Sequence, residues 1–119
     1  MIPKDKIGQD INVGDYIAYG HALGRCAGIR IGKVLAIKGE VHENPWNHKE
    51  ETRWRIHVWG IYDDFPNMEL EILTHKGVLE IPNRIVRLNI DQVPSAYIEL
   101  LRDVTMETKH HKRVYKWKD

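Results

Sequence analysis

The sequence predicts a mostly β protein: a small antiparallel barrel of the SH3-like or OB-like type with one C-terminal helix. Short runs of β-branched and aromatic residues recur along the chain, and Gly, Pro, Asn and Asp separate them. A single apolar stripe with helical spacing lies near the C-terminus. Five or six short strands with frequent turns are typical of such barrels, and 119 residues fit one domain.

The first half of the chain predicts two strands and two loops. Residues 11–19 (INVGDYIAY) start with a Gly-Asp turn and continue as a strand. Residues 20–28 (GHALGRCAG) predict a glycine-rich loop. Residues 29–38 form the second strand, where Gly32 indicates a bulge or a close backbone approach. Residues 38–51 are polar and predict a long exposed loop.

The clearest strand covers residues 52–62 (TRWRIHVWGIY). Apolar and basic side chains alternate there, with Trp54, Ile56 and Val58 on one side and Arg53, Arg55 and His57 on the other. This period of two is expected of a half-buried strand. The first three should therefore face the core, with Arg53 and Arg55 in solvent.

The second half predicts shorter elements. A turn at 63–67 leads to a strand at 68–72, a second turn at 75–77, and strands at 78–81 and 84–89. A helix should begin near Asp91 or Gln92, with Pro94 early in it and an apolar stripe formed by Tyr97, Leu100, Leu101 and Val104. Residues 112–118 fit either a tail or an added edge strand. We assign 1–108 to the barrel and its helix, and 109–119 to a basic tail.

The opening Val-Gly-Asp-Tyr-Ile-Ala-Tyr, followed by Gly-Lys-Val-Leu in the next strand, resembles the first hairpin of SH3-like and KOW-type modules. The chain as a whole resembles small accessory proteins of tailed bacteriophages. That second resemblance transfers no functional residue. It implies a protein that binds and redirects host machinery, such as a polymerase, a nuclease or a defence system.

Composition excludes some classes. Cys26 is the only cysteine, so no internal disulfide and no cysteine-based zinc site can form. No apolar run reaches the roughly 18 residues of a membrane span. We expect a cytoplasmic protein. Eighteen basic and seventeen acidic residues nearly cancel, although residues 109–119 are strongly basic.

The outward face of residues 52–62 is one candidate site. Arg53, Arg55, His57 and Trp59 could contact phosphate and stack on bases. Alternatively, Glu69 and Glu71 neutralise the arginines as cross-strand pairs.

The basic tail is a second candidate. Lysines and arginines, among them Lys112 and Arg113, surround Tyr115 and Trp117. This composition suits nucleic acid, an acidic protein surface or a solubilising tail.

The glycine-rich loop is a third candidate. Its free backbone amides, beside Arg25 and Arg30, could hold a phosphate or nucleotide. The alternative is an ordinary permissive loop, since the spacing is not that of a P-loop or a dinucleotide fingerprint.

The sequence gives weaker evidence for a metal site or a catalytic site than for the three binding sites above. His42, Glu43 and His48, and the pair His110-His111, match no known catalytic spacing. No nucleophile, base and oxyanion site occur together. We therefore predict no enzyme, no metal and no cofactor.

The leading prediction is a non-enzymatic binding module that docks on a host protein or nucleoprotein machine. Exposed aromatic and arginine residues commonly anchor interfaces, and tryptophan occurs both in a polar loop and in the basic tail. The predicted partner-binding residues are Trp46, Arg53, Arg55, Trp59, Lys112, Arg113 and Trp117. The alternatives are a nucleotide-sequestering protein that uses Arg25 and Arg30, and a nucleic-acid-binding barrel.

Overall fold

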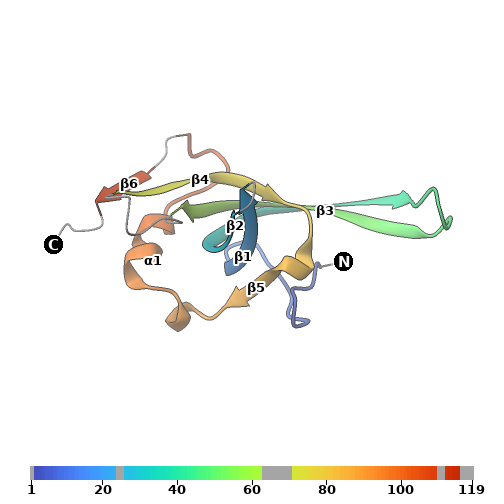
Figure 1. Cartoon of the computed structure of the whole chain (residues 1–119), viewed down its shortest axis with the longest axis horizontal. Helices are drawn as coiled ribbons and strands as arrows, with labels where there is room; N and C mark the ends of the chain where they lie inside the picture. Colours follow the sequence, from blue (N-terminus) through green and yellow to red (C-terminus); the bar gives the residue numbers. More distant parts are fainter. Residues whose placement is uncertain (1, 24–25, 63–70, 110–111, 116–119) are drawn as a thin grey trace.

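The computed structural model describes residues 2–23, 26–62, 71–109 and 112–115. Six antiparallel strands form one sheet in the order β5-β1-β2-β3-β4-β6. The strands are β1 (Tyr16–Leu23), β2 (Cys26–Glu43), β3 (Glu50–Tyr62), β4 (Glu71–Leu79), β5 (Ile85–Leu88) and β6 (Lys112–Tyr115). The sheet curls strongly, and the helix α1 (Ser95–Leu101) lies against it (Figure 1). The mostly β prediction with one helix is confirmed.

Closure into a barrel is not confirmed. The strand pairings run in an open series from β5 to β6, and in the described part of the chain no pairing joins these two ends. The 3₁₀ turns η1 (Pro82–Arg84) and η2 (Ile90–Gln92) flank β5. Through η1 the chain returns from β4 to pair β5 with β1.

Apolar side chains pack on both faces of the sheet, so β3 is buried on both sides. Ile56 and Val58 point into a cluster with residues of β1, β2, β5 and the N-terminal segment. Trp59 and Ile61 point the other way, against Leu101 of α1 and its neighbours Leu100 and Val104. The predicted core positions Trp54, Ile56 and Val58 are thus confirmed. The predicted stripe also packs in the core, but α1 ends at Leu101, so Val104 lies after the helix and not in it.

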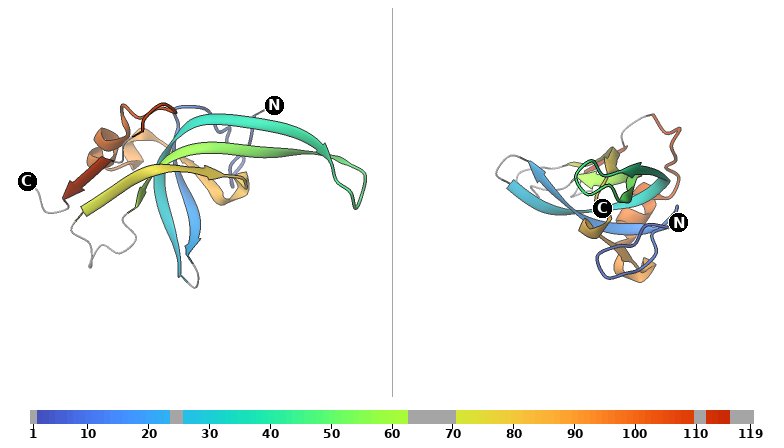
Figure 2. Two further views of the ribbon diagram at one scale, coloured as in Figure 1. Left: turned by 90° about the horizontal axis from the view of Figure 1, so that it is seen from above. Right: turned by 90° about the vertical axis from the view of Figure 1, so that its right-hand side faces the viewer.

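A long two-stranded arm projects from the sheet (Figure 2). We define the arm as residues 38–55, the distal halves of β2 and β3 with the loop 44–49 between them. The molecule extends 56 Å along its longest axis but only 31 and 28 Å along the others. The predicted exposed loop at 38–51 is therefore wrong over most of its length: the strands continue through it, and only the tip is a loop.

Two further loop predictions are wrong for the same reason. Leu23 pairs with Cys26, so the described residues of the glycine-rich segment belong to the paired strands β1 and β2. β4 passes straight through residues 75–77, where a turn was predicted, because His75, Lys76 and Gly77 all pair with β3. In both places the ladder hydrogen bonds offset the poor strand propensity of glycine.

Gly32 has the predicted close backbone approach. A Cβ at Gly32 would lie 2.8 Å from the carbonyl oxygen of Trp59 on the neighbouring strand. The register shifts nearby, between Val34 and Ala36. This bulge at Leu35 lets that side chain contact the cluster on the helix side.

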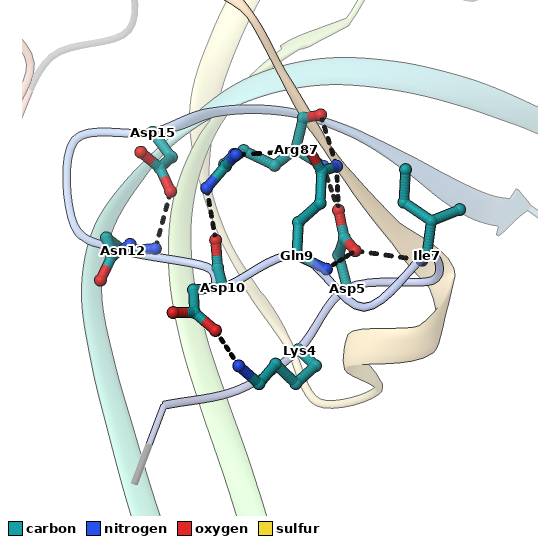
Figure 3. Close-up of polar contacts among 8 residues, drawn as sticks. All are labelled: Lys4, Asp5, Ile7, Gln9, Asp10, Asn12, Asp15 and Arg87. Atoms are coloured by element: carbon teal, nitrogen blue, oxygen red, sulfur yellow. Dashed lines mark hydrogen bonds and ion pairs between the residues drawn. The ribbon is translucent and has the colours of Figure 1, made fainter.

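The N-terminal segment is fixed to β5 by the carboxylate of Asp5 (Figure 3). Asp5 is buried and accepts hydrogen bonds from the backbone amides of Ile7, Gln9 and Arg87 at 2.8–3.0 Å. The Gln9 side-chain amide donates to it as well. Burial alone would raise the pKa of Asp5, but these hydrogen bonds outweigh burial and lower its pKa below the ordinary value.

Candidate functional site

The arm tip presents Trp46 to solvent. Its side chain is 91% exposed, the most exposed of the large hydrophobic residues in the described part of the chain. A tryptophan indole is the largest apolar group a protein can offer a partner. The position predicted as a partner anchor is thus exposed as expected, although it lies at the end of an arm rather than in a long loop.

Hydrogen bonds hold the tip loop in one shape. The Asn44 carboxamide oxygen accepts from the Trp46 amide at 2.8 Å, and the Asn47 carboxamide oxygen accepts from the Lys49 amide at 2.9 Å. Backbone bonds from Asn44 to Lys49 and from His48 to Asn44, both 2.9 Å, close the turn. His48 adopts a positive φ of 57°. The backbone that carries Trp46 is therefore preorganised, which lowers the ordering cost of binding.

The inner face of the arm is apolar near its base. Ile37, Gly39, Val41, Thr52 and Trp54 line a shallow groove of about 240 Å³. Trp54 lies flat on Gly39, where an added Cβ would come within 2.8 Å of the indole ring. Val41 is 61% exposed beyond it. Apolar surface thus extends along this face toward the tip.

The outer face of the arm is charged. Arg53 lies opposite Glu40, Arg55 opposite Lys38, and His42 opposite Glu51. Arg53, Arg55 and Lys38 are all exposed, as predicted for the two arginines. Among the described residues none of these three forms an ion pair within 4 Å.

The alternative in which glutamates of β4 neutralise Arg53 and Arg55 is wrong for Glu71. β4 pairs with β3 only from Ile56 to Tyr62, with Leu79 opposite Ile56 and Leu73 opposite Tyr62. Glu71 therefore lies beyond the far end of this pairing, opposite Tyr115 of β6. Glu69 lies outside the described residues.

Trp59 is not an exposed anchor. It shares a strand face with Arg55, as the alternation predicts, but α1 covers this end of the face and leaves the indole 1% exposed. Its Nε1 donates to Thr74 Oγ1 at 2.8 Å. The prediction is wrong because the alternation fixes the face of a side chain and not what packs against that face.

Arg30 lies in a strand, as predicted for residues 29–38. It is 8% exposed within β2, opposite Tyr19 of β1. Arg25 lies outside the described residues. Arg30 is therefore buried in the sheet, whereas the phosphate-binding alternative needs its guanidinium exposed beside the glycine-rich segment.

The C-terminal residues fall into two groups. Lys112 and Arg113 belong to β6, which pairs with Thr74 and Leu73 of β4, so the edge-strand alternative holds for residues 112–115. Trp117 lies outside the described residues, as do His110 and His111.

No described group of three His, Cys, Asp or Glu side chains comes close enough to hold a metal ion. His48 Nδ1 lies 3.1 Å from Glu43 Oε1 at the arm tip. No helix in the described ranges is long and apolar enough to cross a membrane.

Comparison with known proteins gives one similarity. Residues 3–56 match a family described as Domain of unknown function (DUF7205). The matched segment, less than half of the chain, runs from the N-terminal clamp through β1 and β2 to the middle of β3, and it includes the whole arm. No curated protein and no solved structure matches the chain.

Proposed function

We propose that this protein is a non-enzymatic binding module that docks, through the tip of its β2–β3 arm, on a host protein or nucleoprotein machine in the cytoplasm. The observation that carries the proposal is Trp46, 91% exposed on a loop that four short hydrogen bonds hold in shape. An exposed indole on a loop with a fixed backbone is typical of an interface hot spot.

The free energy gained by burying the Trp46 indole in a partner supports a role in binding. Transferring an indole from water into a partner's apolar pocket removes roughly 150–250 Å² of surface. At about 25 cal/mol per Å² this corresponds to roughly 4–6 kcal/mol before ordering costs. Trp46 is not a member of either apolar cluster of the described residues. The apolar groove beside Trp54 and the exposed Val41 extend the same surface.

For the fold itself we propose an open SH3-like barrel. The meander from β1 to β4 and the return of β5 to β1 through the 3₁₀ turn η1 support this assignment. The arm is then an extended loop between the second and third strands of the barrel. We propose bacteriophage origin on the resemblance of the chain to phage accessory proteins.

The test is a comparison of Trp46→Ala with Ile90→Ala. Ile90 is also exposed, at 63%, but it lies in η2. Each tagged variant is used to capture partners from a bacterial lysate, and the binding of each captured protein is then titrated. Docking through the tip predicts a partner whose affinity falls about thirtyfold or more with Trp46→Ala and stays unchanged with Ile90→Ala. Equal affinities of wild type, Trp46→Ala and Ile90→Ala for the partner would exclude the arm tip as the binding site.

A further inference from the structure

The distal part of β2 has an open edge. β1 pairs with β2 only as far as Lys33, and the backbone of Val34 is bonded to Gly14 and Asp15 just beyond that point. Over residues 35–43, β2 has β3 on one side, and no strand of the described chain pairs with it on the other. The arm leaves the rest of the sheet along this stretch (Figure 2). We call residues 35–43 the open edge, since its backbone groups can accept another strand.

The open edge is self-complementary about Gly39. If two copies pair antiparallel about a two-fold axis at Gly39, Lys38 of each copy lies opposite Glu40 of the other. Ile37 of each copy then lies opposite Val41 of the other. The charged pairs share one face and the apolar pairs share the opposite face, because successive side chains of a strand alternate. Both kinds of cross-strand pair stabilise a sheet.

The same register uses the whole open edge. Gly39 is its central residue, so the two edges overlap from end to end, with Leu35 of one copy opposite Glu43 of the other. Moving the axis by one residue would place Lys38 opposite Lys38, or Glu40 opposite Glu40. Like charges directly opposite each other are destabilising. The sequence therefore favours one register over its two neighbours.

The outer face supplies the charges. Lys38 and Glu40 are both exposed. Within its own arm Lys38 lies opposite Arg55, which is an unfavourable pair of like charges, and Glu40 lies opposite Arg53. Glu40 of a second copy would place a carboxylate on the other flank of Lys38 and offset this repulsion.

The inner face supplies apolar contact. Val41 is 61% exposed, while Ile37 and Trp54 are partly buried against the core cluster. All three line the groove on the inner face of the arm. In the paired arms, Val41 of one copy would lie beside Ile37 of the other and lose part of its exposed surface. The two grooves would then form one apolar surface across the axis.

The other edge of the arm, on β3, is less suited to pairing with itself. It is also open among the described residues, because β4 pairs only with the proximal part of β3. Two copies paired about Thr52 would place Glu51 opposite Arg53, which is favourable. They would also place Glu50 opposite Trp54, where the carboxylate loses hydration beside an apolar ring and gains no partner. The β2 edge matches on both faces, whereas the β3 edge matches on one.

We propose that this protein forms a reversible homodimer in which the open edges of two β2 strands pair antiparallel about Gly39. The inference goes beyond the docking function and does not depend on it, because the tip loop 44–49 lies outside the paired segment. A single pair of strand edges buries less surface than a permanent interface, so the dimer fraction should rise with protein concentration. The dimer carries one Trp46 at each end of the paired arms.

The test is a charge exchange, read by sedimentation velocity over a range of protein concentrations. Lys38→Glu and Glu40→Lys each replace two pairs of opposite charge by two pairs of like charge. Each variant alone should therefore self-associate about tenfold or more weakly than wild type. An equimolar mixture of the two variants restores both pairs of opposite charge and should form a heterodimer with about the wild-type affinity. Glu51→Lys, on the β3 edge, is the matched control and should associate as wild type does.

Recovery in the mixture distinguishes a lost interface from a lost fold, because an unfolded variant would not recover. The proposal is overturned if wild type stays monomeric at every concentration, or if the single variants associate as tightly as wild type. It is also overturned if the mixture associates no better than its components. Weaker association of Glu51→Lys alone would assign the interface to the β3 edge instead. None of these outcomes alters the capture experiment with Trp46→Ala, which reads the arm tip.

Discussion

Trp59 Nε1 donates a 2.8 Å hydrogen bond to Thr74 Oγ1, and both side chains are buried. This bond joins β3 to β4 on the face that α1 covers. A buried indole N–H needs an acceptor. The contact therefore explains why a threonine lies in the core, and it separates the structural Trp59 from the free Trp46.

Replacing Thr74 by Val should destabilise the fold by about 1–3 kcal/mol, because a buried acceptor of the indole is lost. Thr74→Ser is the matched control, since it keeps the hydroxyl and loses one methyl group. Urea unfolding of the three proteins measures the difference. Equal losses for Val and Ser would show that packing, and not the hydrogen bond, decides the stability at this position.

Val58→Asp should lower the free energy of unfolding by several kcal/mol. Val58 is 1% exposed in the cluster shared by β1, β2, β3 and β5, and a carboxylate there would be buried without a partner. Arg53→Asp places the same charge on the exposed face of the same strand and should have a small effect. Thermal melting of the two variants makes the comparison. Unchanged melting of Val58→Asp would contradict the strand register.

Deletion of residues 112–119 should leave the domain folded. Among the described side chains, the two apolar clusters draw on residues up to Val104, and β6 pairs four residues with the edge of β4. Circular dichroism and the melting temperature of the truncated chain report the outcome. An insoluble product would mean that β6 is needed to cover the β4 edge.

The Asp5 clamp predicts acid sensitivity. Because the folded-state pKa of Asp5 lies below the unfolded value of about 3.8, Asp5 stabilises the fold above that pH. This contribution is lost as the pH falls from there through the folded-state pKa. The Asp5→Asn variant lacks the carboxylate at every pH. The difference between its free energy of unfolding and that of wild type should therefore shrink as the pH falls. A difference that stays constant from pH 7 to pH 2 would rule out the ionised clamp.

Sequence patterns predicted the fold class well where side chains alternate, as in residues 52–62. They failed where strands are stabilised by pairing rather than by propensity. The arm contains Gly39 and Glu40 in β2 and polar residues in β3. Their composition predicts a loop, and only the pairing of the two strands with each other shows that they are extended. A hairpin signal was nevertheless available in the Asn-Pro-Trp-Asn sequence at the tip, flanked by matching polar and apolar alternation.

The candidate site was predictable in part. The exposure of Trp46, Arg53 and Arg55 follows from local pattern and was expected. The burial of Trp59 was not, since it depends on α1, some forty residues later in the chain, packing on the same face. Lys38 lies opposite Arg55 because the pairing of β2 with β3 shifts by one residue at the Leu35 bulge. The sequence alone did not predict the position of this shift.

The central claim is that the arm tip carries the binding energy through Trp46. The most direct measurement is the dissociation constant of the captured partner for wild type, Trp46→Ala and Ile90→Ala, with the melting temperature of each protein measured in parallel. We predict identical melting temperatures and a loss of about 2 kcal/mol or more in binding for Trp46→Ala alone, because its indole makes no core contact. An unchanged dissociation constant for Trp46→Ala would contradict the account.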